Sequence, residues 1–142
     1  MSDENQSLCF IDSNIWLYAL LPKQDETKET IAKSLIERNQ PDIVISTQIM
    51  NEIVNNLLRK GRTKKPAIRL LIASFYDEHT VVRMDRTIQE KASLLRENHS
   101  FSHWDSLVVI VALQAGASTL YSEDMQHGFV VDNKLTIVNP FI

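Results

Sequence analysis

The strongest constraint on the fold is a repeated alternation between short apolar runs and longer segments with helical periodicity. The runs, at residues 8–11, 42–46, 80–82, 119–122 and 135–138, are too short for buried helices. Between them, apolar residues recur at every third or fourth position, as they do along one face of a helix. Strands that alternate with helices in this way are typical of an α/β sandwich around a mainly parallel sheet. We therefore predict that fold class.

Several of the predicted helices have recognisable ends. Gly61 ends the third helix, Pro66 suits the first turn of the fourth, and Asp85 caps the fifth. The apolar run Val108–Val111 would also suit a strand, but the residues that follow it, up to Gly116, favour a buried helix. The predicted helices cover residues 14–21, 25–38, 49–60, 66–75, 86–98 and 105–115.

The length and composition fit one globular domain. The chain has 142 residues, of which 44% are hydrophobic, and we predict a single domain over residues 1–142 with residues 1–7 as a flexible tail. Apolar stretches are too short to span a bilayer and the first residues are not signal-like, so we expect a cytoplasmic protein without a membrane partner. A single Cys9 forms no internal disulfide, and we expect it to be a small buried side chain.

One carboxylate interrupts the first apolar segment, LCFIDSNIWLYAL, residues 8–20. Asp12 lies where the predicted strand ends and the first helix begins. Burial of an unpaired carboxylate is costly, so a strand with only a structural role would not contain one here. Asp12 is therefore the leading candidate for a functional residue.

Three further acids fall at positions that could converge with Asp12. Asp124 follows the strand at 119–122, Asp105 begins the apolar helix, and Glu52 lies about one turn into its helix. In α/β folds, ligands bind outside the carboxyl ends of the parallel strands. Carboxylates gathered there repel one another unless a cation lies among them, and Mg²⁺ or Mn²⁺ prefers such oxygen ligands. We predict a metal site at this edge.

Each acid also has a purely structural interpretation. Asp12 could cap the following helix, and Ser102 with Asp105 fits the S-x-x-D pattern of a capping box. Asp124 could be a turn residue and Glu52 a solvated side chain. Taken singly, the structural interpretation is favoured for every acid except Asp12. Only their combination favours a shared site.

Other catalytic chemistries lack their sequence signatures. Three glycines, at 61, 116 and 128, form no phosphate-binding loop and no dinucleotide fingerprint. His99 and His103 have the spacing of a helical metal pair but lie in a loop rich in Ser and Asn, which disfavours a zinc site. A Ser-His-Asp triad would have no nucleophile elbow.

Residues 59–65, RKGRTKK, form a basic strip in an otherwise acidic chain whose net charge is −3. Two interpretations stay open. The strip is either a solvated helix end or a contact for a nucleic-acid backbone, because phosphate contacts position a nucleic acid without reading its sequence. The residues concerned are Arg59, Lys60, Arg62, Lys64 and Lys65.

Four segments resemble the successive motifs of PIN-domain nucleases, in particular the VapC-type ribonuclease toxins of toxin–antitoxin pairs. They are FIDSNIWLYAL, the helix that contains Glu52, WDSLVVIVAL and LYSEDMQHG, and the likeness extends from Phe10 to the closing IVNPF. The resemblance implies a three-layer α/β/α sandwich with a central, mainly parallel sheet. It also implies a metal-dependent endoribonuclease that hydrolyses RNA phosphodiester bonds with Mg²⁺ or Mn²⁺.

The resemblance assigns roles to individual side chains. Ser122 matches a small hydroxyl residue that helps to orient the site, and Asn14 supports Asp12 or contacts the substrate. All four acidic positions of the family are filled, so the resemblance does not indicate a member that has lost its catalytic residues. The residues that match the catalytic and metal-binding acids of the family are Asp12, Glu52, Asp105 and Asp124.

The resemblance also implies protein partners. Toxins of this family are normally silenced by a cognate antitoxin, whose C-terminal segment lies across a hydrophobic groove near the active site, and they commonly form homodimers. Trp16 and Tyr18 lie on the first helix and are expected in the core. If either is exposed, it becomes a candidate for the antitoxin groove.

The sequence allows three rival functions to be compared with this interpretation. A phosphoacceptor receiver-like domain needs a Lys after a late strand, where this chain has Glu123 and Asp124. A phosphatase with an Asp nucleophile would have D-x-D at the first strand, where this chain has Asp12-Ser13-Asn14. The third alternative is a catalytically silent PIN-like module that binds RNA or protein without cleaving it.

Overall fold

The computed structural model describes residues 7–142 and contains a central sheet of short strands. Residues 1–6, which make up most of the predicted flexible tail, lie outside the described part of the chain. Each strand coincides with a predicted apolar run, except β5. The strands are β1 (Cys9–Ile11), β2 (Ile43–Ser46), β3 (Thr80–Val82), β4 (Thr119–Tyr121), β5 (Val130–Val131) and β6 (Leu135–Val138).

The sheet has the order β3-β2-β1-β4-β6-β5 and is parallel except at β5. Strand β1 is central, and Phe10 pairs with Val44 of β2 on one side and Leu120 of β4 on the other. The first three strands along the chain lie in the order β1, β2, β3 toward one edge of the sheet. The next strand, β4, pairs with the other side of β1. The carboxyl ends of β1 and β4 therefore meet where the strand order reverses, which is the usual place for a ligand site in such folds.

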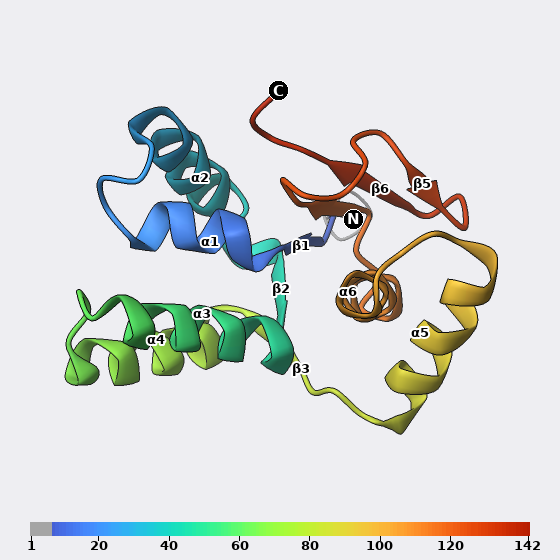
Figure 1. Cartoon of the computed structure of the whole chain (residues 1–142), viewed down its shortest axis with the longest axis horizontal. Helices are drawn as coiled ribbons and strands as arrows, with labels where there is room; N and C mark the ends of the chain where they lie inside the picture. Colours follow the sequence, from blue (N-terminus) through green and yellow to red (C-terminus); the bar gives the residue numbers. More distant parts are fainter. Residues whose placement is uncertain (1–6) are drawn as a thin grey trace.

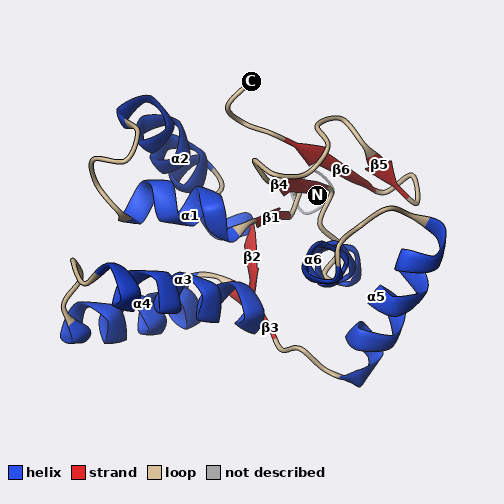
Figure 2. Cartoon of the chain, viewed as in Figure 1, coloured by secondary structure: helices blue, strands red, loops and turns tan. Residues whose placement is uncertain are grey.

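Helices cover both faces of this sheet, which confirms the predicted α/β/α sandwich. Helices α1 to α4 lie on one side of the strands, and α5 and α6 lie on the other (Figure 1; Figure 2 shows the same view coloured by helix and strand). Gly61 ends α3 in a left-handed conformation with φ 68°, as its position predicts. The helices are α1 (Ser13–Leu20), α2 (Glu26–Arg38), the short 3-10 helix η2 (Gln40–Asp42), α3 (Thr47–Lys60), α4 (Lys65–Glu78), α5 (Arg86–Asn98) and α6 (His103–Gln114).

Helix α6 explains the ambiguous apolar run of the sequence. Seven consecutive residues, Ser106–Ala112, are buried, so the helix has almost no polar face. It packs against α5 on one side and against β2 and β4 on the other. The sequence of a helix that is enclosed on all sides is a continuous apolar run, because no face of the helix needs to be polar.

The differences from the sequence prediction include strand β5 and the end of helix α4. Strand β5 was not predicted, because two residues are too few to show an alternating pattern. It pairs antiparallel with β6 through a turn in which Asp132 and Asn133 have φ of 52° and 54°. Asp and Asn tolerate such angles better than most residues, so this pair was an available turn signal. Helix α4 also continues to Glu78, past the predicted end at Phe75.

Cys9 and Trp16 have the buried positions predicted for them. The Cys9 thiol is 3% exposed, and burial raises its pKa to about 12, so it is unreactive. The indole of Trp16 is buried and its Nε1 donates to the carbonyl of Ile11 at 3.2 Å. Tyr18 is half-buried and its hydroxyl donates to Glu123. Within residues 7–142, no helix is long and apolar enough to cross a membrane.

Candidate active site

Asp12 follows β1 and serves both the fold and the site. One carboxylate oxygen, Oδ1, accepts from the backbone N–H of Ser13 at 2.8 Å and so caps α1. The other, Oδ2, accepts from the hydroxyl of Ser122 at 2.8 Å. Although the side chain is only 8% exposed, both oxygens are hydrogen-bonded. The capping interpretation is therefore correct, and it fixes the orientation of the carboxylate at the end of the strand.

The charge of Asp12 is destabilised by its surroundings. Burial is the largest effect and raises the pKa of this carboxyl to about 6, from an ordinary value of 3.8. The hydrogen bonds from Ser122 and Ser13 lower the pKa, while the charges of Glu52 and Asp105 raise it. Mutual repulsion with these two acids shows that three of the predicted acids are electrostatic neighbours.

Glu52 extends from α3 toward the start of α1. Its Oε2 accepts from the hydroxyl of Ser13 at 2.8 Å, and its Oε1 accepts from the side-chain amide of Gln48 at 3.3 Å. The side chain is half-buried. Glu52 is therefore positioned by residues from two helices, which contradicts the interpretation of a freely solvated side chain.

Asp124 lies after β4 and is hydrogen-bonded to Asn14, the last residue of the stretch Asp12-Ser13-Asn14. The side-chain amide of Asn14 donates to Asp124 Oδ2 at 3.0 Å, and the backbone N–H of Asp124 donates to Ser122 Oγ at 3.3 Å. Asn14 Oδ1 is buried without a hydrogen-bond partner. Asn14 thus supports Asp124 rather than Asp12, and Ser122 contacts both acids that follow the central strands.

Asp105 joins the cluster from the opposite layer of the sandwich. The hydroxyl of Ser102 accepts from its backbone N–H at 3.1 Å, which confirms the predicted cap of α6. Burial and the charge of Asp124 raise the pKa of its carboxyl, while the Ser102 hydrogen bond lowers it. The four predicted acids are therefore linked in a chain of repulsions and hydrogen bonds, which we call the acidic edge: Asp12, Glu52, Asp105 and Asp124.

The acids are not packed into a ready metal cage. Within residues 7–142, no group of three or more His, Cys, Asp or Glu side chains is close enough to hold a metal ion. Ser13, Ser122, Asn14 and Gln48 instead donate hydrogen bonds to the carboxylates. Sequence reasoning missed Ser13 and Gln48. Their signals were modest: Ser13 is the central residue of D-S-N, and Gln48 lies one turn before Glu52.

Two hollows flank the acidic edge. The first, which we call the amide groove, has a volume of about 740 Å³ and includes Glu52. The second has a volume of about 400 Å³ and includes Asp105 and Asp124. The remaining residues of the amide groove are Gln48, Asn51, Asn55, Met84, Gln89, Trp104 and Leu107. Glu52 therefore opens to one hollow, and Asp105 and Asp124 open to the other.

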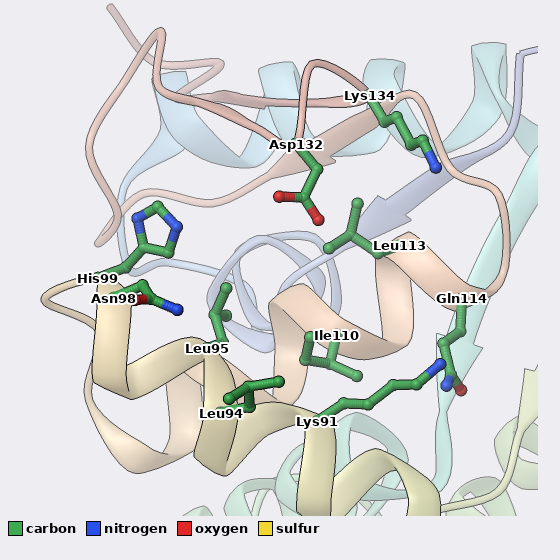
Figure 3. A pocket seen from close by; sticks show the side chains of 10 residues that line it. All are labelled: Lys91, Leu94, Leu95, Asn98, His99, Ile110, Leu113, Gln114, Asp132 and Lys134. Carbon is green, nitrogen blue, oxygen red and sulfur yellow. The ribbon is translucent and has the colours of Figure 1, made fainter.

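A third hollow, of about 470 Å³, lies apart from the acids. It is enclosed by α5, α6 and the turn between β5 and β6, and its charged groups include Lys91, Asp132 and Lys134 (Figure 3). Because its lining includes none of the four acids, it is not the centre of the predicted chemistry.

The basic strip lies at the outer end of the α3–α4 hairpin, away from the strand ends (Figure 1). Glu52 and Arg59 are separated by seven residues of one helix, or about 10 Å along its axis. All five basic side chains are exposed, and Arg59 donates to Asn56 at 2.6 Å. The strip is therefore not a part of the acidic edge, and its contact with RNA stays a prediction.

Comparison with known proteins identifies the family. The family model described as the PIN domain matches residues 9–128. No curated protein sequence matches the chain at a significant level.

Solved structures share the fold at low sequence identity. A toxin–antitoxin complex from Klebsiella pneumoniae has 16% identity and a TM-score of 0.71, covering 94% of this chain and 98% of that one. The sarcin-ricin loop cleaving toxin VapC20 of Mycobacterium tuberculosis has 17% identity and a TM-score of 0.63, covering 79% and 86%. VapBC2 from Rickettsia felis, bound to a DNA fragment from its promoter, has 17% identity and a TM-score of 0.61, covering 93% and 99%. With the family match spanning most of the described residues, the chain belongs to the PIN-domain family.

Proposed function

We propose that this protein is a metal-dependent endoribonuclease and the toxin of a toxin–antitoxin pair. The observation that carries the proposal is the acidic edge, where acids from four distant segments meet beside the ends of β1 and β4. Structural similarity to a toxin–antitoxin complex and to a toxin that cleaves the sarcin-ricin loop supports it. The proposed partners are an RNA substrate, a cognate antitoxin and a second copy of the chain, in the cytoplasm.

The donor chemistry of the acidic edge fits Mg²⁺ or Mn²⁺. Carboxylate and amide oxygens are the ligands these ions prefer, and buried Asn14 Oδ1 is an acceptor that has no partner. Each carboxylate oxygen can accept more than one bond, so the existing hydrogen bonds do not prevent ligation. A cation would also relieve the repulsion that raises the pKa of Asp12 and Asp105. The proposed ligands are Asp12, Asp105, Asp124 and, directly or through water, Glu52.

The protein groups position the substrate phosphate and the attacking water. A bound divalent ion would acidify a water molecule and stabilise negative charge on the scissile phosphate. Ser13 and Ser122 each donate a hydrogen bond to one oxygen of Asp12, which orients this carboxylate toward the site. Glu52, which accepts hydrogen bonds from Ser13 and Gln48, would accept a further one from the attacking water. Asn14 donates a hydrogen bond to Asp124.

Cleavage assays with matched variants test this proposal. Wild-type protein, Asp12→Asn and Asp105→Asn are each incubated with RNA in Mg²⁺, in Mn²⁺ and in EDTA. Of these three proteins we expect only the wild type to cleave, and only with a metal ion, whereas Glu123→Gln should cleave as the wild type does. Glu123→Gln is the matched control, because Glu123 adjoins Asp124 in sequence but hydrogen-bonds Tyr18 and pairs with Lys28 instead. Equal cleavage in EDTA, or full activity of both Asp variants, would contradict the proposal.

One observation favours a second candidate, a PIN-like module that binds RNA or protein without cleavage. In the described residues no three acids are grouped closely enough to hold a metal ion, and Glu52 and Asp124 accept hydrogen bonds from Ser13 and Asn14. Calorimetric titration with Mn²⁺ separates the two functions. Binding that is lost in Asp12→Asn supports the nuclease, whereas an absence of binding in the wild type supports the silent module.

A further inference from the structure

The amide groove has a composition that the acidic edge does not explain. Its polar lining consists mainly of neutral amides, from Gln48, Asn51 and Asn55 on α3 and Gln89 on α5. Among residues 7–142 it is lined by no Lys or Arg, and its single charged residue, Glu52, belongs to the acidic edge. A surface that only attracted phosphates would be basic. The groove is instead suited to a neutral ligand with both hydrogen-bond donors and acceptors.

Trp104 supplies a flat apolar surface in the same groove. The side chain is 60% exposed, which is unusual for so large an apolar group, and it immediately precedes Asp105 in the first turn of α6. The neighbouring ring of His103, which is also exposed, contacts it in an edge-to-face arrangement with ring centroids 5.3 Å apart. An exposed indole beside a proposed nuclease centre is the kind of surface on which unpaired bases stack.

Gln48 provides a second, independent indication of a ligand. The residue lines the groove and is 9% exposed, and its Oε1 has no hydrogen-bond partner although its Nε2 donates to Glu52. A buried amide oxygen without a donor costs free energy, and a rotation of the Gln48 side chain that turned this oxygen into the groove would let a ligand N–H group satisfy it. The exocyclic amines and ring N–H groups of nucleobases are donors of this type.

We propose that the amide groove binds one unpaired nucleobase of the RNA substrate, stacked on Trp104 and read by the amides of α3 and α5. This inference rests on the proposed function, because Glu52 joins the groove to the edge where the scissile phosphate would lie. A base is a flat apolar ring with a polar rim, which matches the indole, Met84 and Leu107 together with the surrounding amides. Bases inside a duplex cannot enter, so the substrate class is single-stranded or looped RNA.

RNA-binding measurements on Asp12→Asn, which keeps the RNA intact, test stacking. Short oligoribonucleotides of uridine, adenosine, cytidine or guanosine are titrated, and tryptophan fluorescence is recorded. We expect quenching of exposed Trp104 while buried Trp16 gives a constant background. Trp104→Ala should raise Kd, measured by anisotropy of labelled RNA, about five- to one-hundred-fold, and Trp104→Phe should restore part of the loss.

The control for stacking is Tyr76→Ala, which removes an exposed aromatic side chain from α4. We expect its Kd to equal that of the parent. If Trp104→Ala binds RNA as tightly as Tyr76→Ala, or if fully paired duplex RNA quenches Trp104 as strongly as a single strand, the inference is wrong. Loss of antitoxin binding in Trp104→Ala with unchanged RNA binding would also overturn it, because the groove would then dock a protein.

Base preference tests the role of the amides. Asn55→Ala and Gln89→Ala should change the ranking of the four oligoribonucleotides, whereas Gln114→Ala, an exposed amide at the far end of α6, should not. An unchanged ranking in both groove variants would contradict the inference. Wild-type protein that binds these RNAs through Trp104 but cuts none of them with Mg²⁺ or Mn²⁺ would contradict the proposed nuclease and still support the groove.

Discussion

The acidic edge and the basic strip are the two charged regions of this molecule, and they are assembled in opposite ways. The acids are far apart in the sequence and are brought together by β1, α3, α6 and β4. The bases are neighbours within residues 59–65 and stay together at one exposed hairpin end. Folding thus creates the first cluster at an energetic cost, while the second needs no fold at all.

This difference indicates where function is expected. Partial burial of like charges destabilises a protein, as the raised pKa of Asp12 shows, so such an arrangement needs a compensating role. Exposed like charges on a turn cost little and are screened by salt. We therefore expect changes at the acidic edge to have large effects and changes at the basic strip to have small ones.

The largest expected effect is the loss of cleavage when an acid of the edge is neutralised. Asp12→Asn should lower the rate of RNA cleavage by about a thousandfold or more, because it removes a charge that orients the metal and the phosphate. The measurement is single-turnover cleavage of a labelled RNA in Mg²⁺. A decrease in the cleavage rate of less than about tenfold would show that the acidic edge is no more important for function than the basic strip.

The second prediction concerns stability and pH. Between pH 3.8 and about 6, the native state of Asp12 binds more protons than the unfolded state, so the free energy of unfolding falls as pH rises. Above about pH 6 the penalty is complete and amounts to about 3 kcal/mol for a shift of this size. In EDTA, Asp12→Asn should therefore match the wild type near pH 4 and exceed its unfolding free energy at pH 7. Urea unfolding at both pH values measures the difference. Equal unfolding free energies of the wild type and Asp12→Asn at pH 7 would show that burial does not destabilise the charged form of Asp12.

Metal ions should reverse part of that penalty. With free Mn²⁺ at a hundred times its dissociation constant, the wild type should gain about 2.7 kcal/mol of stability, because only the native state assembles the acids. Asp12→Asn and Asp105→Asn should gain much less, while Glu123→Gln should behave as the wild type. Thermal unfolding with and without Mn²⁺ measures the gain. An equal gain in all variants would place the ion elsewhere.

A smaller effect is expected from the hydroxyl that links two of the acids. Ser122→Ala removes the hydrogen bond to Asp12 Oδ2 and the acceptor for the Asp124 N–H. We expect a loss of about 1 kcal/mol in stability and a further rise in the pKa of Asp12. The acid limb of the cleavage pH profile should move to higher pH. Ser118→Ala, in the exposed turn before β4, is the matched control, and an identical pH profile in both variants would contradict the role of Ser122.

The smallest effect is expected at the basic strip. Reversal of Arg59, Lys60 and Arg62 to Glu should weaken RNA binding only severalfold and reduce its salt dependence, without a change in the cleavage rate of bound RNA. Binding isotherms at several salt concentrations measure both quantities. Unchanged affinity and slope would identify the strip as a solvated hairpin end, whereas a loss of the chemical step would contradict its separation from the acidic edge.

Local signals predicted the elements of the fold well. The caps at Asp85 and Ser102 and the left-handed end of α3 at Gly61 depend on a few adjacent residues, so they can be read directly from the sequence. Strand β5 was missed because its existence depends on pairing with β6 rather than on its own two residues.

The acids of the candidate site could be predicted from the sequence, but most of the side chains that hydrogen-bond to them could not. Asp12 and Asp124 could be placed because each follows an apolar strand, and parallel strands present their carboxyl ends at one edge. The contact of Ser13 with Glu52 joins residues 39 positions apart, and the amide groove combines α3, α5 and α6. No local pattern specifies which side chains will face one another across such distances.

The sequence by itself determined the α/β class, the helix ends and the acids, since these depend on short-range periodicity and residue chemistry. The tertiary structure decided how each carboxylate is held, that Asn14 supports Asp124, that the basic strip lies apart, and that Trp104 shares a groove with four amides. The physical reason is that burial, electrostatic repulsion and hydrogen bonding between distant residues depend on their separation in space, which only the packing of helices on the sheet fixes.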